Sequence, residues 1–225
     1  MPEDRIKIIN MPGYSAPSSE RKGTDMRTIV LFIAMSLDGY IADPAGGVDW
    51  LSGQDDSAED AGPYPAFIRG VDTIIMGYHT WNQITTELSP EEWIYPGQKS
   101  YVITHKALPS SETVTFTSED PCSLVRRLAG EDGKAIWICG GAEIIRQLMK
   151  EHMINRYHIS VIPTILGNGI RLFSPMEREV KLRLIRAQTW NGITDLIYEP
   201  RFSPQPSFLS GTPLASYGKT AGRRG

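Results

Sequence analysis

Short, uninterrupted apolar segments separated by helical patterns are the feature of this sequence that most restricts its fold. A strand without polar alternation must be covered on both faces, as central strands of a parallel sheet are. Such segments occur at Thr28–Met35, Thr73–Met76, Ser100–Thr104, Thr113–Phe116 and Ala135–Cys139. We therefore expect a sheet that is buried between two layers.

Helical patterns lie between these strands, and this alternation predicts an α/β fold with a mostly parallel sheet. One helix is expected to start at the N-cap Asp120, with Pro121 at its first position, and to end at Gly130. The other predicted helices are Pro63–Arg69, His79–Ile84 and Gly141–His152.

The last part of the chain has a different pattern. Arg156–Pro163 alternates more, so we expect a half-exposed strand or one nearer an edge. Leu182–Thr189 and Thr194–Tyr198 flank Trp190-Asn191-Gly192, and Asn-Gly is a strong signal for a two-residue hairpin turn. The sheet should therefore end in an antiparallel C-terminal hairpin.

Composition divides the 225 residues into one domain with two extensions. Residues 1–25 and 203–225 are rich in Pro, Gly and Ser and are expected to be flexible and dispensable for folding. Residues 26–202 form the predicted domain. Met26 stands just before the first strand, so residues 1–25 are either an extension or the product of a misassigned start.

Charge and composition argue against several classes of protein. The net charge is −3, and the three basic residues of 203–225 leave −6 for the rest of the chain, which disfavours nucleic-acid binding. No apolar run approaches the roughly 20 residues that span a bilayer, and no signal-peptide pattern is present, so we expect a cytoplasmic protein. Cys122 and Cys139 are expected to be buried free thiols, and no metal site is expected.

Four strand ends carry residues suited to a ligand. They are Ser36-Leu37-Asp38-Gly39, Gly77-Tyr78-His79-Thr80, Thr104-His105-Lys106 and Cys139-Gly140-Gly141. Each alone is also consistent with an ordinary packed turn. The carboxyl ends of parallel strands share one edge of a sheet, so the four strand ends together predict a site for a long polyanionic cofactor. The bare glycine backbone at the helix starts would lie against its phosphates. The G-x-G-x-x-G fingerprint of Rossmann domains is absent.

The order of these motifs resembles the dihydrofolate-reductase superfamily, particularly the riboflavin-biosynthesis reductase domain of bacterial bifunctional deaminase-reductases, as a stand-alone member. The matching stretches are SLDGYIAD (36–43), GGVDW (46–50), DTIIMGYHTW (72–81), KSYVIT (99–104), IWICGGAEIIRQL (136–148) and ILGNGIRLF (165–173). The resemblance implies a dihydrofolate-reductase-like three-layer fold that binds NADPH along the carboxyl ends of the strands, with NADH not excluded. It also implies a Gly140–Gly141 peptide that is often cis and a homodimer with Ile165–Phe173 or the late strands in the contact.

The resemblance further assigns residues to parts of the site. Ala34 and Ile41 would line the nicotinamide. Beside the resemblance, we expect Asp38 to be the catalytic polar group and Ser36, Asp38 and Trp50 to contact the substrate, although Trp50 in an exposed loop is equally consistent with packing or a dimer contact. The phosphates and adenosine would lie against Gly77, Tyr78, His79, Thr80, Thr104 and His105. The diphosphate would be bordered by Gly140, Gly141, Glu143, Ile144 and Ile145.

Three departures from the family pattern affect specificity. Tyr78 stands where many relatives have an arginine for the 2′-phosphate of NADPH, and residues 62–67 lack the acid of folate reductases. The loop 82–98 lacks the DDP motif typical of the riboflavin pathway. Separately, the zinc signature of the deaminase half is missing.

Two hypotheses about function follow. One is an NAD(P)H-dependent reductase of a small heterocyclic or ribityl-type substrate, resembling 5-amino-6-(5-phosphoribosylamino)uracil reductase. The other is a non-catalytic nucleotide-binding module.

Overall fold

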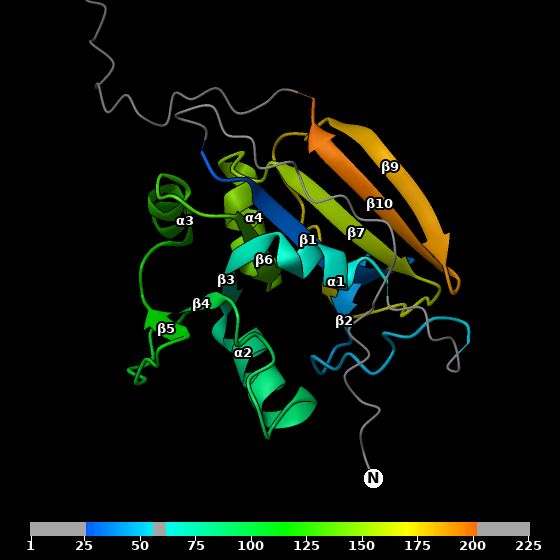
Figure 1. Cartoon of the computed structure of the whole chain (residues 1–225). Coiled ribbons are helices and arrows are strands. Elements are labelled where there is room, and N and C mark those ends of the chain that lie inside the picture. The colour runs from blue at the N-terminus through cyan, green and yellow to red at the C-terminus, as the bar shows by residue number, and fades with distance from the viewer. Residues whose placement is uncertain (1–25, 56–61, 202–225) are drawn as a thin grey trace, which may run out of the picture.

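The computed structural model describes residues 26–55 and 62–201, and the predicted extensions 1–25 and 203–225 lie outside them. An eight-stranded sheet in the order β5-β4-β3-β6-β1-β7-β10-β9 forms the centre of the molecule (Figure 1). Six neighbouring strands are parallel: β1 (Ile29–Ser36), β3 (Val71–Gly77), β4 (Lys99–Ile103), β5 (Val114–Thr117), β6 (Ala135–Gly140) and β7 (Arg156–Ile162). The predicted parallel sheet is confirmed.

Helices cover both faces of the sheet, which gives the expected three layers. The helices are α1 (Tyr64–Arg69), α2 (Tyr78–Gln83), α3 (Pro121–Ala129) and α4 (Ala142–Lys150). One apolar core joins α3 and α4 to the sheet, and a second core joins α1 to the other face. α3 begins as predicted, because the Asp120 carboxylate accepts a hydrogen bond from the Ser123 backbone N–H at 2.9 Å.

The C-terminal hairpin is confirmed and consists of β9 (Leu182–Trp190) and β10 (Ile193–Pro200). Asn191 and Gly192 have φ angles of 42° and 75°, as a turn with two left-handed residues requires. β10 pairs with β7, so β9 rather than β7 is the edge strand on this side.

The expectation that β7 is half-exposed is therefore wrong. His158 and Ser160, the polar residues that produced its alternation, are buried. The Ser160 hydroxyl and the Trp190 indole N–H donate to the carboxylate of buried Asp195 on β10, and His158 Nε2 lies 3.5 Å from it. Ser160 is buried because the hairpin supplies its hydrogen-bonding partner, and His158 lies within ion-pair distance of the same carboxylate.

Two small features were not predicted. A second sheet pairs β2 (Tyr40–Ala42) with β8 (Ile170–Arg171), and α2 continues into a π-helical segment, η1 (Ile84–Leu88). Strands of two or three residues are too short for a periodic signal. Within the described part of the chain, no helix is long and apolar enough to cross a membrane.

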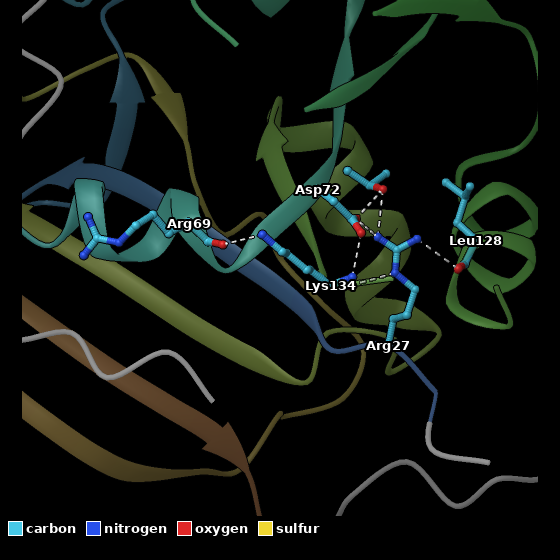
Figure 2. Close-up of polar contacts among 6 residues, drawn as sticks. Arg27, Arg69, Asp72, Leu128 and Lys134 are labelled. Carbon is cyan, nitrogen blue, oxygen red and sulfur yellow. Dashed lines mark hydrogen bonds and ion pairs between the residues drawn. The ribbon is translucent and has the colours of Figure 1, made fainter. Parts of the chain in front are cut away.

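A buried arginine joins three elements at the amino ends of the strands (Figure 2). Arg27, which is 3% exposed, forms an ion pair with Asp72 and donates to the Thr73 hydroxyl at 2.7 Å and the Lys134 carbonyl at 2.7 Å. Asp72 also accepts from the Lys134 backbone N–H at 2.6 Å. This network ties the start of β1 to β3 and β6.

We expect Asp72→Ala to lower the free energy of unfolding by about 2–4 kcal/mol, because it leaves the Arg27 guanidinium buried without its counter-charge. Urea denaturation measures the change. Glu119→Ala removes one acidic partner of the exposed Arg127 and should cost less than about 1 kcal/mol. Equal costs for the two variants would contradict a special role for the carboxylate that pairs with the buried Arg27.

Candidate functional site

The predicted strand ends meet at one edge of the sheet. Met76 pairs with Gly140, and Gly77 pairs with Ile103, immediately before Thr104. β1 and β6 are also parallel neighbours, so Ala34 and Ser36 lie near the same edge. The expectation that residues 34, 76, 104 and 139 lie near one edge is confirmed, and Figure 1 shows α2 below this edge.

Three glycines leave bare backbone at the centre of this edge. A Cβ on Gly77 would lie 3.7 Å from the Gly141 nitrogen, so the two strand-to-helix turns are in close contact. A Cβ on Gly140 or Gly141 would lie 3.7 or 3.9 Å from the Thr80 hydroxyl oxygen. The Gly140–Gly141 peptide is cis, and Gly140 has a φ of 136°, which residues with side chains rarely adopt. The result is a backbone cradle with a hydroxyl beside it.

The first turn of α4 borders this cradle. The Glu143 carboxylate accepts hydrogen bonds from Arg146 and Gln147, which hold its pKa below the ordinary value. Arg146 thereby offsets the negative charge of Glu143 beside the cradle. Ile144 and Ile145 are buried, and the Ile145 N–H donates to the Gly141 carbonyl, so these two residues contribute packing beneath the cradle.

Basic and polar groups lie beyond the ends of β3 and β4. Lys106 Nζ lies 3.7 Å from the centroid of the Tyr78 ring, in a cation–π contact. Thr104, His105 and Lys106 line a cavity of about 300 Å³ together with residues at the end of β5. His79 directly follows Tyr78 at the start of α2, and its side chain is exposed. The Lys106–Tyr78 contact joins two strand ends and has no signal in the sequence.

Asp38 is engaged in holding loops together. Its carboxylate accepts hydrogen bonds from the Ser36 hydroxyl at 2.7 Å and from the backbone N–H groups of Leu166 at 3.1 Å and Gly167 at 2.7 Å. The Ser36 hydrogen bond in particular keeps the pKa of Asp38 below its ordinary value of 3.8. An anchored, ionised carboxylate suits a positioning role better than the catalytic role expected from the sequence.

The loop after β2 is folded on itself and tied to α2. Asp43 accepts from the backbone N–H groups of Ala45 and Gly47, and the Trp50 indole N–H donates to the Gly47 carbonyl at 3.2 Å. Gln83 donates to the Gly46 carbonyl at 2.9 Å. Trp50 is half-buried, and its contact with substrate remains a prediction.

An aromatic wall on the α1 face of the sheet was not predicted. Phe32, Ala34, Tyr64 and Cys139 are all half-buried there, although β1 and β6 are central strands. The Phe32 and Tyr64 ring centroids are 6.4 Å apart, and Cys139 directly precedes the glycine pair. Burial raises the pKa of the Cys139 thiol to about 12, so it stays protonated. Tyr64 was not among the predicted site residues, although it lies at the start of the predicted helix Pro63–Arg69.

Both cysteines are free, as expected, but only Cys122 is buried.

The residues expected in a dimer contact include Ile165, Ile170 and Phe173, which are exposed, and the dimer remains a prediction. A larger hollow of about 510 Å³ lies against Met149 and Leu182, and none of the predicted site residues lines it.

Comparison with known proteins agrees with this geometry. The model of the RibD C-terminal domain matches residues 27–198. The chain belongs to the RibD C-terminal domain family. The chain is also similar to the uncharacterized protein YwjB of Bacillus subtilis (strain 168), with 38% identity over 175 residues, which cover 76% of this chain and 97% of YwjB.

Solved structures place this RibD-type domain in the dihydrofolate-reductase-like fold. A protein from Shewanella sp. PV-4, provisionally assigned to riboflavin biosynthesis, matches with a TM-score of 0.69 and 25% identity over 78% of this chain and 99% of that one. Dihydrofolate reductase from Enterococcus faecalis, complexed with NADP(H), matches with a TM-score of 0.56 and 12% identity over 79% and 99% of the two chains. These matches confirm the dihydrofolate-reductase-like fold that the sequence predicts.

We expect Asp38→Asn to lower the melting temperature at pH 7 without abolishing binding of NADPH. An amide cannot accept all the hydrogen bonds of the carboxylate. Because the folded pKa of Asp38 is depressed, its stabilisation is present above about pH 4 and is lost as the pH falls through the folded value.

Thermal melts of wild type and variant at pH 7 and pH 3 test this. The difference between their melting temperatures should be smaller at pH 3 than at pH 7. A pH-independent difference would contradict the role of ionised Asp38 as an anchor. If the variant lost NADPH binding without losing stability, Asp38 would be a binding residue and not an anchor.

Proposed function

We propose that this chain is an NAD(P)H-dependent reductase of a small heterocyclic or ribityl-type substrate. The observation that carries the proposal is the backbone cradle of Gly77, Gly140 and Gly141, beside the Thr80 hydroxyl. Side chains at these positions would fill the space, whereas bare backbone at the start of α4 suits a diphosphate. Membership of the RibD C-terminal domain family supports this use of the cradle.

The cofactor supplies the hydride, and the protein supplies binding and orientation. The cradle would hold the diphosphate, with Thr80 donating a hydrogen bond. The cavity at Thr104, His105 and Lys106 would take the adenosine end, where the Lys106 ammonium offers a positive charge. Ala34, near the end of β1, would lie beside the nicotinamide and leave the aromatic wall for the substrate.

The second candidate is a non-catalytic nucleotide-binding module. The observation in its favour is that the Asp38 carboxylate is occupied by structural hydrogen bonds and α1 carries no acid. A dedicated acid is not required for hydride transfer, so we favour the reductase. A module of this kind would bind NADPH and leave it unoxidised with every small heterocyclic substrate offered.

Gly141→Val should weaken NADPH binding by more than tenfold, about 1.4 kcal/mol, because the added side chain occupies the cradle. The fold should survive: the nearest heavy atom to a Cβ at Gly141 is the Thr80 hydroxyl oxygen at 3.9 Å, and the φ of Gly141 is −86°. Quenching of tryptophan fluorescence by NADPH measures the change.

Gly97→Val is the matched control, since a Cβ there meets nothing within 4 Å and the residue precedes the amino end of β4. It should bind NADPH like wild type. A folded Gly141→Val protein that binds NADPH like the control would show that the cradle is not the cofactor site.

Tyr78→Arg should shift the preference between the cofactors towards NADPH by about fivefold or more. A guanidinium beside Lys106 can pair with a 2′-phosphate, which NADH lacks. Parallel titrations with NADPH and NADH give the ratio of dissociation constants. Tyr78→Phe keeps the ring and loses only the hydroxyl that donates to Asn82, so its ratio should match wild type. An unchanged ratio in Tyr78→Arg would place the 2′-phosphate elsewhere.

A further inference from the structure

A lysine without a carboxylate partner lies beyond the end of β4, beside the first residue of α2. Lys106 Nζ is 3.7 Å from the centroid of the Tyr78 ring. Its ammonium forms no ion pair with any residue of 26–55 or 62–201. The cavity that Lys106 lines has no acidic residue in its wall, and α2 contains none. The positive charge of Lys106 is therefore available to an anionic ligand.

The Tyr78 ring that contacts this ammonium is itself held in place. Its hydroxyl donates to the Asn82 side chain at 3.0 Å, and its ring packs against Trp81, with centroids 5.6 Å apart. Trp81 in turn contacts Phe116, which lines the cavity, with centroids 4.9 Å apart. A free lysine side chain samples many rotamers, whereas an ammonium attracted to a fixed ring samples fewer. Tyr78 therefore keeps the Lys106 ammonium at the start of α2.

Two threonine hydroxyls in the wall of the same cavity add hydrogen-bond donors. Thr104 Oγ1 accepts from the Lys106 backbone N–H at 3.1 Å, and Thr117 Oγ1 accepts from the Glu119 backbone N–H at 3.1 Å. Neither hydroxyl donates to another described residue, so both protons are available to a ligand. The Glu119 carboxylate is paired with Arg127 at 2.8 Å, which offsets its charge. Hydroxyl donors beside an unpaired ammonium suit a phosphate group.

The cavity continues the line of the backbone cradle. Gly77 pairs with Ile103, and these residues directly precede Tyr78 and Thr104, so the cavity begins one residue beyond the cradle. A dinucleotide whose diphosphate lay on the cradle would extend its adenosine towards the cavity. The adenosine of NADPH carries a 2′-phosphate, which that of NADH lacks. An unpaired cation at this place therefore distinguishes the two cofactors.

We infer that Lys106 binds the 2′-phosphate and makes this chain select NADPH over NADH, with Tyr78 as the residue that positions the ammonium. The inference rests on the proposed function and adds the choice of cofactor, which that function leaves open. The charge comes from the end of β4, and the aromatic side chain on α2 holds it. A contact between an exposed ammonium and a ring is weaker than a charge-assisted hydrogen bond to phosphate, so the ammonium can move from the ring to the ligand.

The test compares dissociation constants of the full chain for NADPH and NADH, measured by quenching of tryptophan fluorescence at low and high salt. Wild type should bind NADPH about tenfold more tightly at low salt, and high salt should reduce this ratio. Lys106→Met removes the charge and keeps the length of the side chain. It should weaken NADPH binding about tenfold and leave NADH binding within about twofold of wild type. Lys106→Arg keeps the charge and should keep most of the preference.

Tyr78→Leu tests the positioning role, because it removes the ring and leaves Lys106 in place. It should lower the ratio about threefold, and it should have no further effect in a protein that also carries Lys106→Met. Lys99→Met is the matched control. Lys99 Nζ lies over the Tyr101 ring at 5.5 Å, at the amino end of the same strand, so its loss should leave the ratio unchanged.

A Lys106→Met protein with the wild-type ratio would overturn the inference. Equal binding of the two cofactors by wild type, or equal weakening of both by Lys106→Met, would also overturn it. An effect of Tyr78→Leu on the ratio that persists in the Lys106→Met protein would contradict the positioning role of the ring. If neither cofactor bound to wild type, the proposed function itself would be wrong, which the other outcomes do not imply.

Discussion

The parallel register of β3, β6 and β1 is the constraint on which the site depends. Pairing of Met76 with Gly140 sets the two glycine turns side by side, so that a Cβ on Gly77 would lie 3.7 Å from the Gly141 nitrogen. A shift of either strand by one residue would separate the turns and move a core side chain to the other face of the sheet. The cradle is therefore a property of strand pairing, and no single loop contains it.

Stability and binding are divided between the two ends of the sheet. The amino ends hold the buried Arg27 with Asp72 and Thr73, a closed network with satisfied donors. The carboxyl ends are open: Phe32 and Cys139 are half-exposed on central strands, and Asp38 anchors the loop that follows β7. In open α/β sheets ligands bind at this edge, which is where the proposed cofactor site lies.

The sequence predicted the parallel strands, α3 with its Asp120 cap and the hairpin at Asn191-Gly192, because these rest on local patterns. It failed for β7, where Ser160 is buried only because Asp195, 35 residues later, supplies its partner. The four strand ends of the site were also predictable, since each follows an apolar run. The aromatic wall and the contact of Lys106 with Tyr78 arise from packing between elements distant in sequence, for which no local pattern exists.

The roles of polar residues were harder to predict than their positions. Asp38 was placed at the correct strand end, but its hydrogen bonds come from Leu166 and Gly167, beyond the reach of a sequence motif. Ile145 shows the converse, because the family motif includes it while its side chain lies wholly in the core.

Hydrogen exchange of the full chain with and without NADPH tests the central claim most directly. The account predicts slower exchange in residues 77–80, 104–106 and 140–145, at the three carboxyl ends, and no change at the amino ends around Arg27 and Lys134. Protection confined to other segments, or none at saturating NADPH, would contradict a cofactor site at this edge.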